Sequence, residues 1–191
     1  MPSSPTKIAV LLVGGRSTRM GEDKFAMNVN GQPQWKFMLE QLNSFFDEVY
    51  IACRRDQQEH FKGQKLIFDE LENIGPMGAI YSSFRLFESR YSTFESSFFV
   101  ACDMPKFDIR LSAKLHAERS PGYDVVAAWN PERKSAEPLA AFWNRSALPQ
   151  IEEFISRENY ALFKCMSQLK VKTVEIEDSN MLQNINSPSD L

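Results

Sequence analysis

A stretch near the start of the chain combines glycines with basic side chains in a pattern that suits phosphate binding. Residues 12–24 read Leu-Val-Gly-Gly-Arg-Ser-Thr-Arg-Met-Gly-Glu-Asp-Lys. The glycines expose backbone N–H groups and let the chain approach a ligand closely, while Arg16, Arg19 and Lys24 supply cations. Cations and N–H groups in one loop are what a polyphosphate requires. A solvated basic loop without a ligand is the alternative, and the loop alone does not decide between the two.

The same stretch differs from two common nucleotide-binding patterns. It lacks the Gly-Lys-Ser/Thr that follows a spaced glycine in a P-loop, and it lacks Gly-x-Gly-x-x-Gly. A GTPase switch protein and a Rossmann dehydrogenase are therefore disfavoured.

Two aspartates follow short apolar runs and are further candidates for chemistry. Asp103 follows the run 98–102 and precedes Met-Pro, and Asp69 follows the run 66–68. A carboxylate such as Asp103 could hold Mg²⁺ on a nucleotide, because magnesium takes one or two carboxylates plus phosphate oxygens. A helix N-cap or turn aspartate is the alternative for both residues. Position alone favours that alternative for Asp69 and leaves Asp103 undecided.

The elements that must position these residues alternate between strands and helices. Apolar runs typical of buried strands lie at 8–13, 49–53, 66–68, 98–102, 125–129 and 139–143, and an alternating run lies at 171–176. Helical apolar spacing covers 33–46, 77–87, 146–156 and 160–169, and a polar connection is expected from 130 to 138. The pattern predicts an α/β fold with three layers, α/β/α, and a mainly parallel central sheet.

This fold predicts where the chemistry lies. In open α/β sheets, ligands bind beyond the carboxyl ends of the strands. The loop after Val13, Asp69 and Asp103 all follow such ends. We therefore expect them on one rim of the sheet.

Composition narrows the class of protein. The chain has 191 residues, of which 43% are hydrophobic and 25% charged, which predicts a single domain over 1–191. Residues 1–6 are polar with two prolines, and we expect them to be a disordered tail. The net charge of −3 argues against nucleic acid or an anionic membrane as a partner.

Cysteine and histidine usage points to a reducing compartment. Three scattered cysteines and two histidines disfavour a disulfide framework or a histidine-rich metal centre. No run approaches the roughly 18 apolar residues of a membrane span, and the first residues lack the order of a signal peptide. We therefore expect a cytoplasmic protein.

Taken together, these segments resemble the molybdenum cofactor guanylyltransferase family, within the glycosyltransferase-like nucleotidyltransferases. The family pattern is close to Leu-Ala-Gly-Gly-x-Ser-x-Arg-Met-Gly-x-Asp-Lys, from which residues 12–24 depart only at Val13. Further matches follow in family order, at 46–49, 55–57, Asp69, 75–78, 101–105, 138–142 and 184–191. The resemblance covers almost the whole chain and implies a Rossmann-like nucleotidyltransferase fold of the nucleotide-diphospho-sugar transferase type.

The resemblance also implies an activity, which is transfer of GMP from Mg-GTP to the phosphate of molybdenum-bearing molybdopterin, with release of pyrophosphate. By position, the nucleotide would be bound by Leu12, Val13, Gly14, Gly15, Lys24, Arg54, Asp69 and Asp103. Arg19, Lys24 and Asp103 would act in catalysis, and Asp103 would bind Mg²⁺, the one cofactor implied. The acceptor phosphate attacks directly, so no side-chain nucleophile is needed.

The implied partners are GTP and molybdopterin. Asn184 and Asn186 would contact the acceptor, although capping of a last helix is an equal alternative for Asn186. Because molybdopterin is labile, we also expect a protein that delivers it. The chain is expected to be a monomer or a weak oligomer.

Departures from the family pattern keep other functions open. Arg54 stands where the family often has asparagine, and 75–79 reads Gly-Pro-Met-Gly-Ala in place of the commoner Gly-Pro-Leu-Ala-Gly, a change expected to shift the loop. One alternative is a cytidylyltransferase for the same cofactor or a sugar-phosphate nucleotidyltransferase. The other is a nucleotide-binding regulator without turnover. The double glycine after Val13 favours guanine, and Lys24 with Asp103 argues against the regulator.

Overall fold

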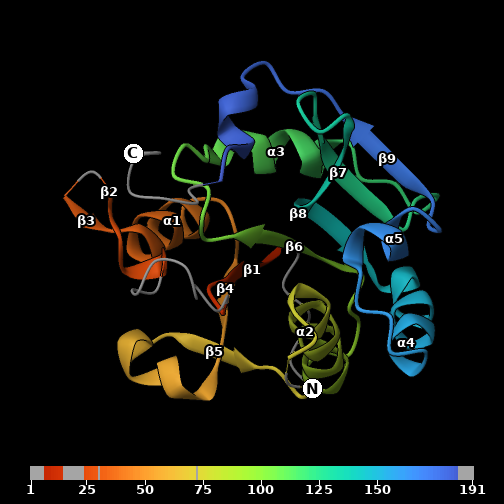
Figure 1. Cartoon of the computed structure of the whole chain (residues 1–191), viewed down its shortest axis with the longest axis horizontal. Helices are drawn as coiled ribbons and strands as arrows, with labels where there is room; N and C mark the ends of the chain where they lie inside the picture. Colours follow the sequence, from red (N-terminus) through yellow and green to blue (C-terminus); the bar gives the residue numbers. More distant parts are fainter. Residues whose placement is uncertain (1–6, 15–23, 30, 72, 185–191) are drawn as a thin grey trace.

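A seven-stranded sheet forms the centre of the computed structural model, which describes residues 7–14, 24–29, 31–71 and 73–184. Its strands are β1 (Ile8–Leu12), β4 (Glu48–Cys53), β5 (Lys65–Phe68), β6 (Ser96–Ala101), β7 (Val125–Asn130), β8 (Ser135–Asn144) and β9 (Val171–Val174). They lie in the order β5-β4-β1-β6-β8-β7-β9 (Figure 1). Only β8 runs antiparallel to its neighbours in this sheet. The mainly parallel sheet predicted from the sequence is confirmed.

The central strands are buried on both faces, which explains their continuous apolar sequences. β1 reads Ile-Ala-Val-Leu-Leu, and all of its residues are buried except the half-buried Leu12. It pairs with β4 and β6, so that Ala9 lies opposite both Val49 and Phe98. Every side chain of such a strand meets a helical layer whichever way it points, so the sequence does not alternate.

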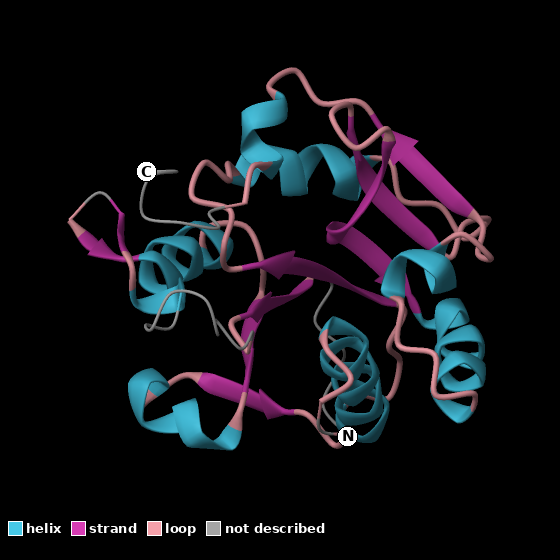
Figure 2. Ribbon diagram, in the orientation of Figure 1, coloured by secondary structure: helices cyan, strands magenta, loops and turns pink. Residues whose placement is uncertain are grey.

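Helices cover both faces of the sheet (Figure 2). On one face lie α1 (Gln34–Asn43) and α3 (Ile109–Ala117), and on the other lie α2 (Pro76–Arg90), α4 (Leu148–Ser156) and α5 (Leu162–Met166). Each face has its own apolar core, one around Phe46, Phe98 and Phe142 and the other around Phe84, Phe87 and Phe99. The three predicted layers are therefore confirmed.

Short elements complete the described part of the chain. β2 (Asn28–Val29) and β3 (Gln32–Pro33) form a small antiparallel pair, and the 3₁₀ helices are η1 (Lys24–Ala26), η2 (Arg55–Phe61), η3 (Arg145–Ala147) and η4 (Ser179–Leu182). No helix in these described ranges has the length and apolar character needed to cross a membrane.

The clearest difference from the sequence prediction is the start of β8. A polar connection was expected from 130 to 138, yet β8 begins at Ser135 and pairs with β7, with Ser135 opposite Asn130 and Glu137 opposite Ala128. The partner strand satisfies the backbone of this polar segment, which no local apolar pattern reveals. The helix expected over 160–169 is shorter, at Leu162–Met166, and β9 ends at Val174.

Candidate functional site

The strand order creates a crevice between β1 and β6. From β1 the chain passes to β4 and β5 on one side, and β6 then pairs on the other side of β1. Ligands of open α/β sheets bind at such a change of direction, beyond the carboxyl ends of the strands. A cavity of about 790 Å³ lies there, lined by residues that follow β1, β4, β5 and β6.

The predicted site residues meet in this cavity wherever the structure describes them. Its lining includes Leu12, Val13, Gly14, Arg54, Asp69, Asp103 and Asn184. The expected common rim is thus confirmed as an arrangement. Gly15, Arg16, Arg19, Asn186 and the side chain of Lys24 lie outside the described residues, although the Lys24 backbone begins η1.

The end of β1 presents backbone to the cavity. The Val13 N–H donates to the Ala52 carbonyl at 3.0 Å, and the Cys102 N–H donates to the Leu12 carbonyl at 2.9 Å. These bonds hold the segment between β4 and β6. Gly14 follows, and a Cβ there would lie 3.8 Å from the Arg54 nitrogen. Leu12, Val13 and Gly14 all line the cavity, and Gly14 has no side chain to limit the approach of a ligand.

Arg54 is held at the cavity wall by Asp56. Its Nε donates to Oδ1 at 3.0 Å and its Nη2 donates to Oδ2 at 3.1 Å, which is a two-point fork. The Arg54 N–H also donates to Gln57 Oε1 at 3.1 Å, at the start of η2. The guanidinium is therefore oriented before any ligand binds. The sequence marked Arg54 as a departure but gave no sign of the role of Asp56.

Asp69 follows β5 and is half-buried. Burial raises the pKa of its carboxyl to about 6. The next residue, Glu70, donates its N–H to Ser82 Oγ of α2 at 2.8 Å, which fixes the chain as it leaves the strand. A carboxyl in this setting is ionised above pH 6, when it can accept hydrogen bonds from a ligand.

The turn into α2 explains why position 78 is glycine and not the alanine that is common in the family pattern. A Cβ at this position would lie 2.9 Å from Cγ1 of Ile74 and 3.2 Å from the Leu71 carbonyl oxygen. The alanine common in the family pattern therefore requires a shift, and glycine allows the turn to pack tightly on the first turn of α2. Gly75, at φ 65°, and Asn73, also at φ 65°, line the cavity from this turn.

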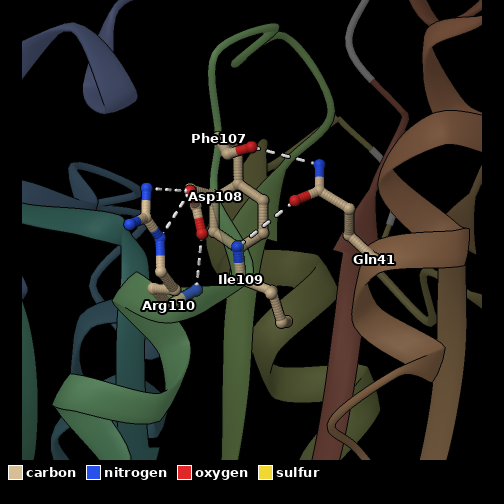
Figure 3. Close-up of polar contacts among 5 residues, drawn as sticks. All are labelled: Gln41, Phe107, Asp108, Ile109 and Arg110. Atoms are coloured by element: carbon tan, nitrogen blue, oxygen red, sulfur yellow. Dashed lines mark hydrogen bonds and ion pairs between the residues drawn. The ribbon is translucent and has the colours of Figure 1, made fainter.

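Asp103 stands at the end of β6 on a segment fixed from α1. Gln41 donates from Nε2 to the Phe107 carbonyl at 3.1 Å and accepts the Ile109 N–H on Oε1 at 3.2 Å (Figure 3). Asp108 caps α3 by accepting the Arg110 N–H at 2.8 Å. The far end of the segment is thus held at residues 107–110, and its start is held by the hydrogen bond from Cys102 to Leu12, while Asp103 between them lines the cavity.

The opposite wall is formed by β8 and the end of the described chain. Glu137 and Leu139 of β8 line it, together with Asn184. The Asn184 Oδ1 is buried and has no hydrogen-bond partner among the residues the structure describes. Glu137 was not found from the sequence, because it lies in the segment expected to be a loop.

The donor set suits a metal brought by a nucleotide. No group of three or more His, Cys, Asp or Glu side chains that could hold a metal occurs within the described ranges. Of the carboxylates that line the cavity, Asp103 follows β6, the strand that pairs with β1. Magnesium bound to phosphates accepts such a set, because phosphate oxygens and water complete its six ligands.

Comparisons with known proteins agree with this geometry. A family model described as the MobA-like NTP transferase domain matches residues 9–172. A molybdenum cofactor guanylyltransferase of Campylobacter jejuni (strain 81116) is 30% identical over 180 residues, which cover 93% of this chain and 89% of the relative. A probable molybdenum cofactor guanylyltransferase of Thermococcus sibiricus is 30% identical over 197 residues, covering 96% and 95%.

Solved structures show the same fold. Molybdopterin-guanine dinucleotide biosynthesis protein A from Archaeoglobus fulgidus matches with a TM-score of 0.79 and 23% identity, over 96% of this chain and 94% of that one. A 4-diphosphocytidyl-2C-methyl-D-erythritolsynthase from Anaerococcus prevotii matches with a TM-score of 0.66 and 15% identity, over 96% and 91%. These likenesses confirm the predicted nucleotidyltransferase fold.

Proposed function

The chain belongs to the MobA-like NTP transferase family, and from that premise we propose that it transfers GMP from GTP to molybdenum-bearing molybdopterin and releases pyrophosphate. The observation that carries the proposal is the meeting of seven expected residues in one cavity at the β1–β6 crevice: Leu12, Val13, Gly14, Arg54, Asp69, Asp103 and Asn184. Different parts of the cavity are assigned below to the nucleoside, to the phosphates and to the acceptor.

One half of the cavity suits the nucleoside. This half, called the nucleotide half below, is formed by residues that follow β1, β4 and β5, together with the turn into α2. Backbone groups at Leu12 to Gly14 contact guanine and ribose, and ionised Asp69 accepts hydrogen bonds from the base or the sugar. Arg54, oriented by Asp56, adds donors beside them.

The phosphates lie between the two halves. Lys24 and Arg19 contact them, and Asp103 holds Mg²⁺, which would neutralise charge on the phosphate oxygens when bound. Gln41 keeps the Asp103 segment in place. Backbone N–H groups and cations that are already positioned stabilise the charge that develops at the α-phosphorus.

The other half, called the acceptor half below, is formed by Asp103, Glu137, Leu139 and Asn184. Here the acceptor phosphate oxygen attacks the α-phosphorus. A new P–O bond forms as the α–β bridging bond breaks, and the electron pair leaves with pyrophosphate. In this half, the buried Oδ1 of Asn184 accepts a hydrogen bond from molybdopterin.

The setting of the reaction is part of the proposal. All three cysteines are buried and free, which supports a reducing, cytoplasmic location. We further propose that a separate protein delivers molybdopterin and that this chain is a monomer or a weak oligomer. Co-purification under gentle conditions, with light scattering of the pure chain, tests both points.

The decisive experiment is turnover with matched nucleotides. The chain is incubated with Mg²⁺, molybdenum-bearing molybdopterin and GTP, CTP or UTP, and the dinucleotide product and pyrophosphate are measured. We expect product with GTP and little with CTP or UTP. Preference for CTP or UTP would move the chain to the cytidylyl or sugar-nucleotide alternative. Tight GTP binding without any product would support the non-catalytic regulator.

A further inference from the structure

A buried carboxylate in the acceptor half has no role in the reaction as described so far. Glu137 of β8 is 3% exposed and lines the cavity. In the pairing of β6 with β8, Val100 lies opposite Ala140. Asp103, three residues after Val100, and Glu137, three residues before Ala140, line the same cavity. Burial raises the pKa of Glu137, and the charge of Asp103 adds to that rise.

Glu137 is paired with a cation on the β7–β8 turn. Arg133 Nη1 donates to Glu137 Oε2 at 3.1 Å. The two side chains differ in burial, since that of Glu137 is 4% exposed and that of Arg133 is 45% exposed. A guanidinium carries five N–H donors in a planar fork, and this bond uses only its Nη1 corner. Glu137 therefore fixes Arg133 from the protein side while much of the guanidinium faces solvent.

The turn that carries Arg133 is also fixed. Asn130 Oδ1 accepts the N–H groups of Glu132 and Arg133, each at 3.1 Å. Lys134 then takes a left-handed conformation, with φ of 50°, as the chain enters β8. Arg133 is thus held both through its backbone N–H and through its guanidinium.

The charges of the two halves differ in a way that calls for this cation. Among the described lining residues, the basic ones are Arg54 and Arg55, and both belong to the nucleotide half. The acceptor half offers two carboxylates and an amide, from Asp103, Glu137 and Asn184. A phosphate monoester dianion entering that half must approach the carboxylate of Glu137 and the phosphates of GTP. Like charges at short range oppose such an approach.

We propose that Arg133 binds the phosphate of the acceptor and that Glu137 is the positioning residue that holds its guanidinium at the rim of the acceptor half. This inference rests on the proposed function, because it names the part of the site that receives the second substrate. Arg133 suits the task, since a guanidinium fork matches phosphate oxygens in two-point geometry.

The test separates the two substrates kinetically. Arg133→Ala is expected to raise KM for molybdenum-bearing molybdopterin about tenfold to a hundredfold, the range for loss of a charge-assisted contact. KM for GTP and the calorimetric affinity for GTP are expected to stay within about twofold. Glu137→Gln, which keeps an oxygen acceptor but loses the charge, is expected to raise the acceptor KM a few-fold. If Arg133 and Glu137 had only a structural role, these substitutions would not raise KM for the acceptor while leaving KM for GTP unchanged.

A matched control is Arg157→Ala. Arg157 pairs with Glu153 at the same spacing of four residues, with its side chain 69% exposed, and neither residue lines the cavity. Its removal is expected to leave both KM values unchanged. If Arg133→Ala does not fold, Arg133→Gln removes the charge while keeping a donor for Glu137, and the same rise in acceptor KM is expected.

Two results would overturn the inference. One is an unchanged acceptor KM in a folded Arg133 variant, and the other is a fall in kcat with both KM values unchanged. Failure of the proposed function is distinguishable, because the unsubstituted chain would then form no dinucleotide from GTP and molybdopterin.

Discussion

The two halves of the cavity are built in different ways. The nucleotide half uses residues that directly follow the parallel strands β1, β4 and β5. The acceptor half depends on an antiparallel strand, β8, and on the end of the described chain at Asn184. Local order along the chain places the groups of the first half, whereas contacts between distant segments place those of the second. The sequence therefore marked most residues of the nucleotide half, whereas in the acceptor half it missed Glu137.

Charge follows the same division. The nucleotide half presents oriented backbone and a guanidinium, with Arg54 bonded to Asp56. The acceptor half presents the carboxylates of Asp103 and Glu137, and Arg133, which is not among the lining residues, is bonded to Glu137. Substitutions in one half are expected to affect one substrate, and substitutions at the boundary to affect both.

The largest effect is expected at the boundary. Asp103→Ala is expected to lower kcat/KM about 10³-fold or more, because the metal-binding carboxylate is lost. Affinity for GTP without Mg²⁺ is expected to change little, while the gain in affinity on adding Mg²⁺ disappears. Calorimetry with and without the metal measures this. Glu153→Ala serves as the control and is expected to leave kcat/KM unchanged, since Glu153 pairs with Arg157 at the surface and does not line the cavity. Wild-type turnover by Asp103→Ala would remove the metal assignment.

A smaller loss is expected in the loop that enters η1. Lys24→Ala is expected to reduce transition-state stabilisation by about 2–4 kcal/mol, the scale for one pre-organised electrostatic group. Steady-state kinetics over a range of GTP concentrations gives kcat/KM. Lys62→Ala is the control, since Lys62 is exposed and paired with Glu59 at 2.7 Å. Equal kcat/KM values for Lys24→Ala and the control would exclude phosphate binding by Lys24.

A pH effect is expected in the nucleotide half alone. Burial raises the pKa of Asp69 to about 6, and its ionised form accepts stronger, charge-assisted hydrogen bonds from guanine or ribose than its protonated form does. Affinity for GTP is therefore expected to fall about tenfold between pH 7 and pH 5. The Asp69→Asn variant, measured at the same pH values, lacks the pH dependence that comes from Asp69. Any change in affinity that it still shows comes from the titration of GTP itself. If the two pH profiles coincide, Asp69 does not contact the nucleotide through its charge.

The same shift has a consequence for stability. The pKa of Asp69 in the folded chain lies above its ordinary value of 3.8, so the folded state binds the proton more tightly. The stabilisation from Asp69 is then fully present below pH 3.8 and is lost as pH rises through about 6. Denaturant unfolding of the wild type and Asp69→Asn at pH 5 and pH 7.5 measures the difference.

The smallest effect is expected when the hydrogen bonds of Gln41 to the segment that follows Asp103 are removed. Gln41→Ala removes two hydrogen bonds to the segment between β6 and α3, and we expect a loss of about 1–3 kcal/mol in the free energy of unfolding. The kcat is expected to fall a few-fold with KM for GTP unchanged, because the position of Asp103 loosens. Gln32→Ala is the control, since the Gln32 side chain donates to Glu40 at the exposed surface. Unchanged stability and kcat would show that Asp103 is placed without Gln41.

Much of the fold could be predicted because its signals are local. The runs 8–12 in β1, 49–53 in β4 and 98–101 in β6 are apolar, as expected of strands buried on both faces, and α2 shows a clear apolar stripe. The start of β8 could not be predicted, because its polar residues form a strand only through pairing with β7. For α3, the first turn is fixed by the Asp108 cap and by Gln41, which is far away in the chain.

The sequence by itself determined the fold class, the glycine-rich loop and the rim on which Leu12, Asp69 and Asp103 stand. It could do so because each of these features depends on neighbours in the chain and on the direction of parallel strands. Only the tertiary structure decided that Asp56 orients Arg54, that Gln41 fixes the Asp103 segment and that Glu137 holds Arg133 beside the acceptor half. The Gln41 contact depends on how distant segments pack, whereas the other two join residues four positions apart or fewer. The geometry of all three is set by the folded backbone, which short motifs do not record.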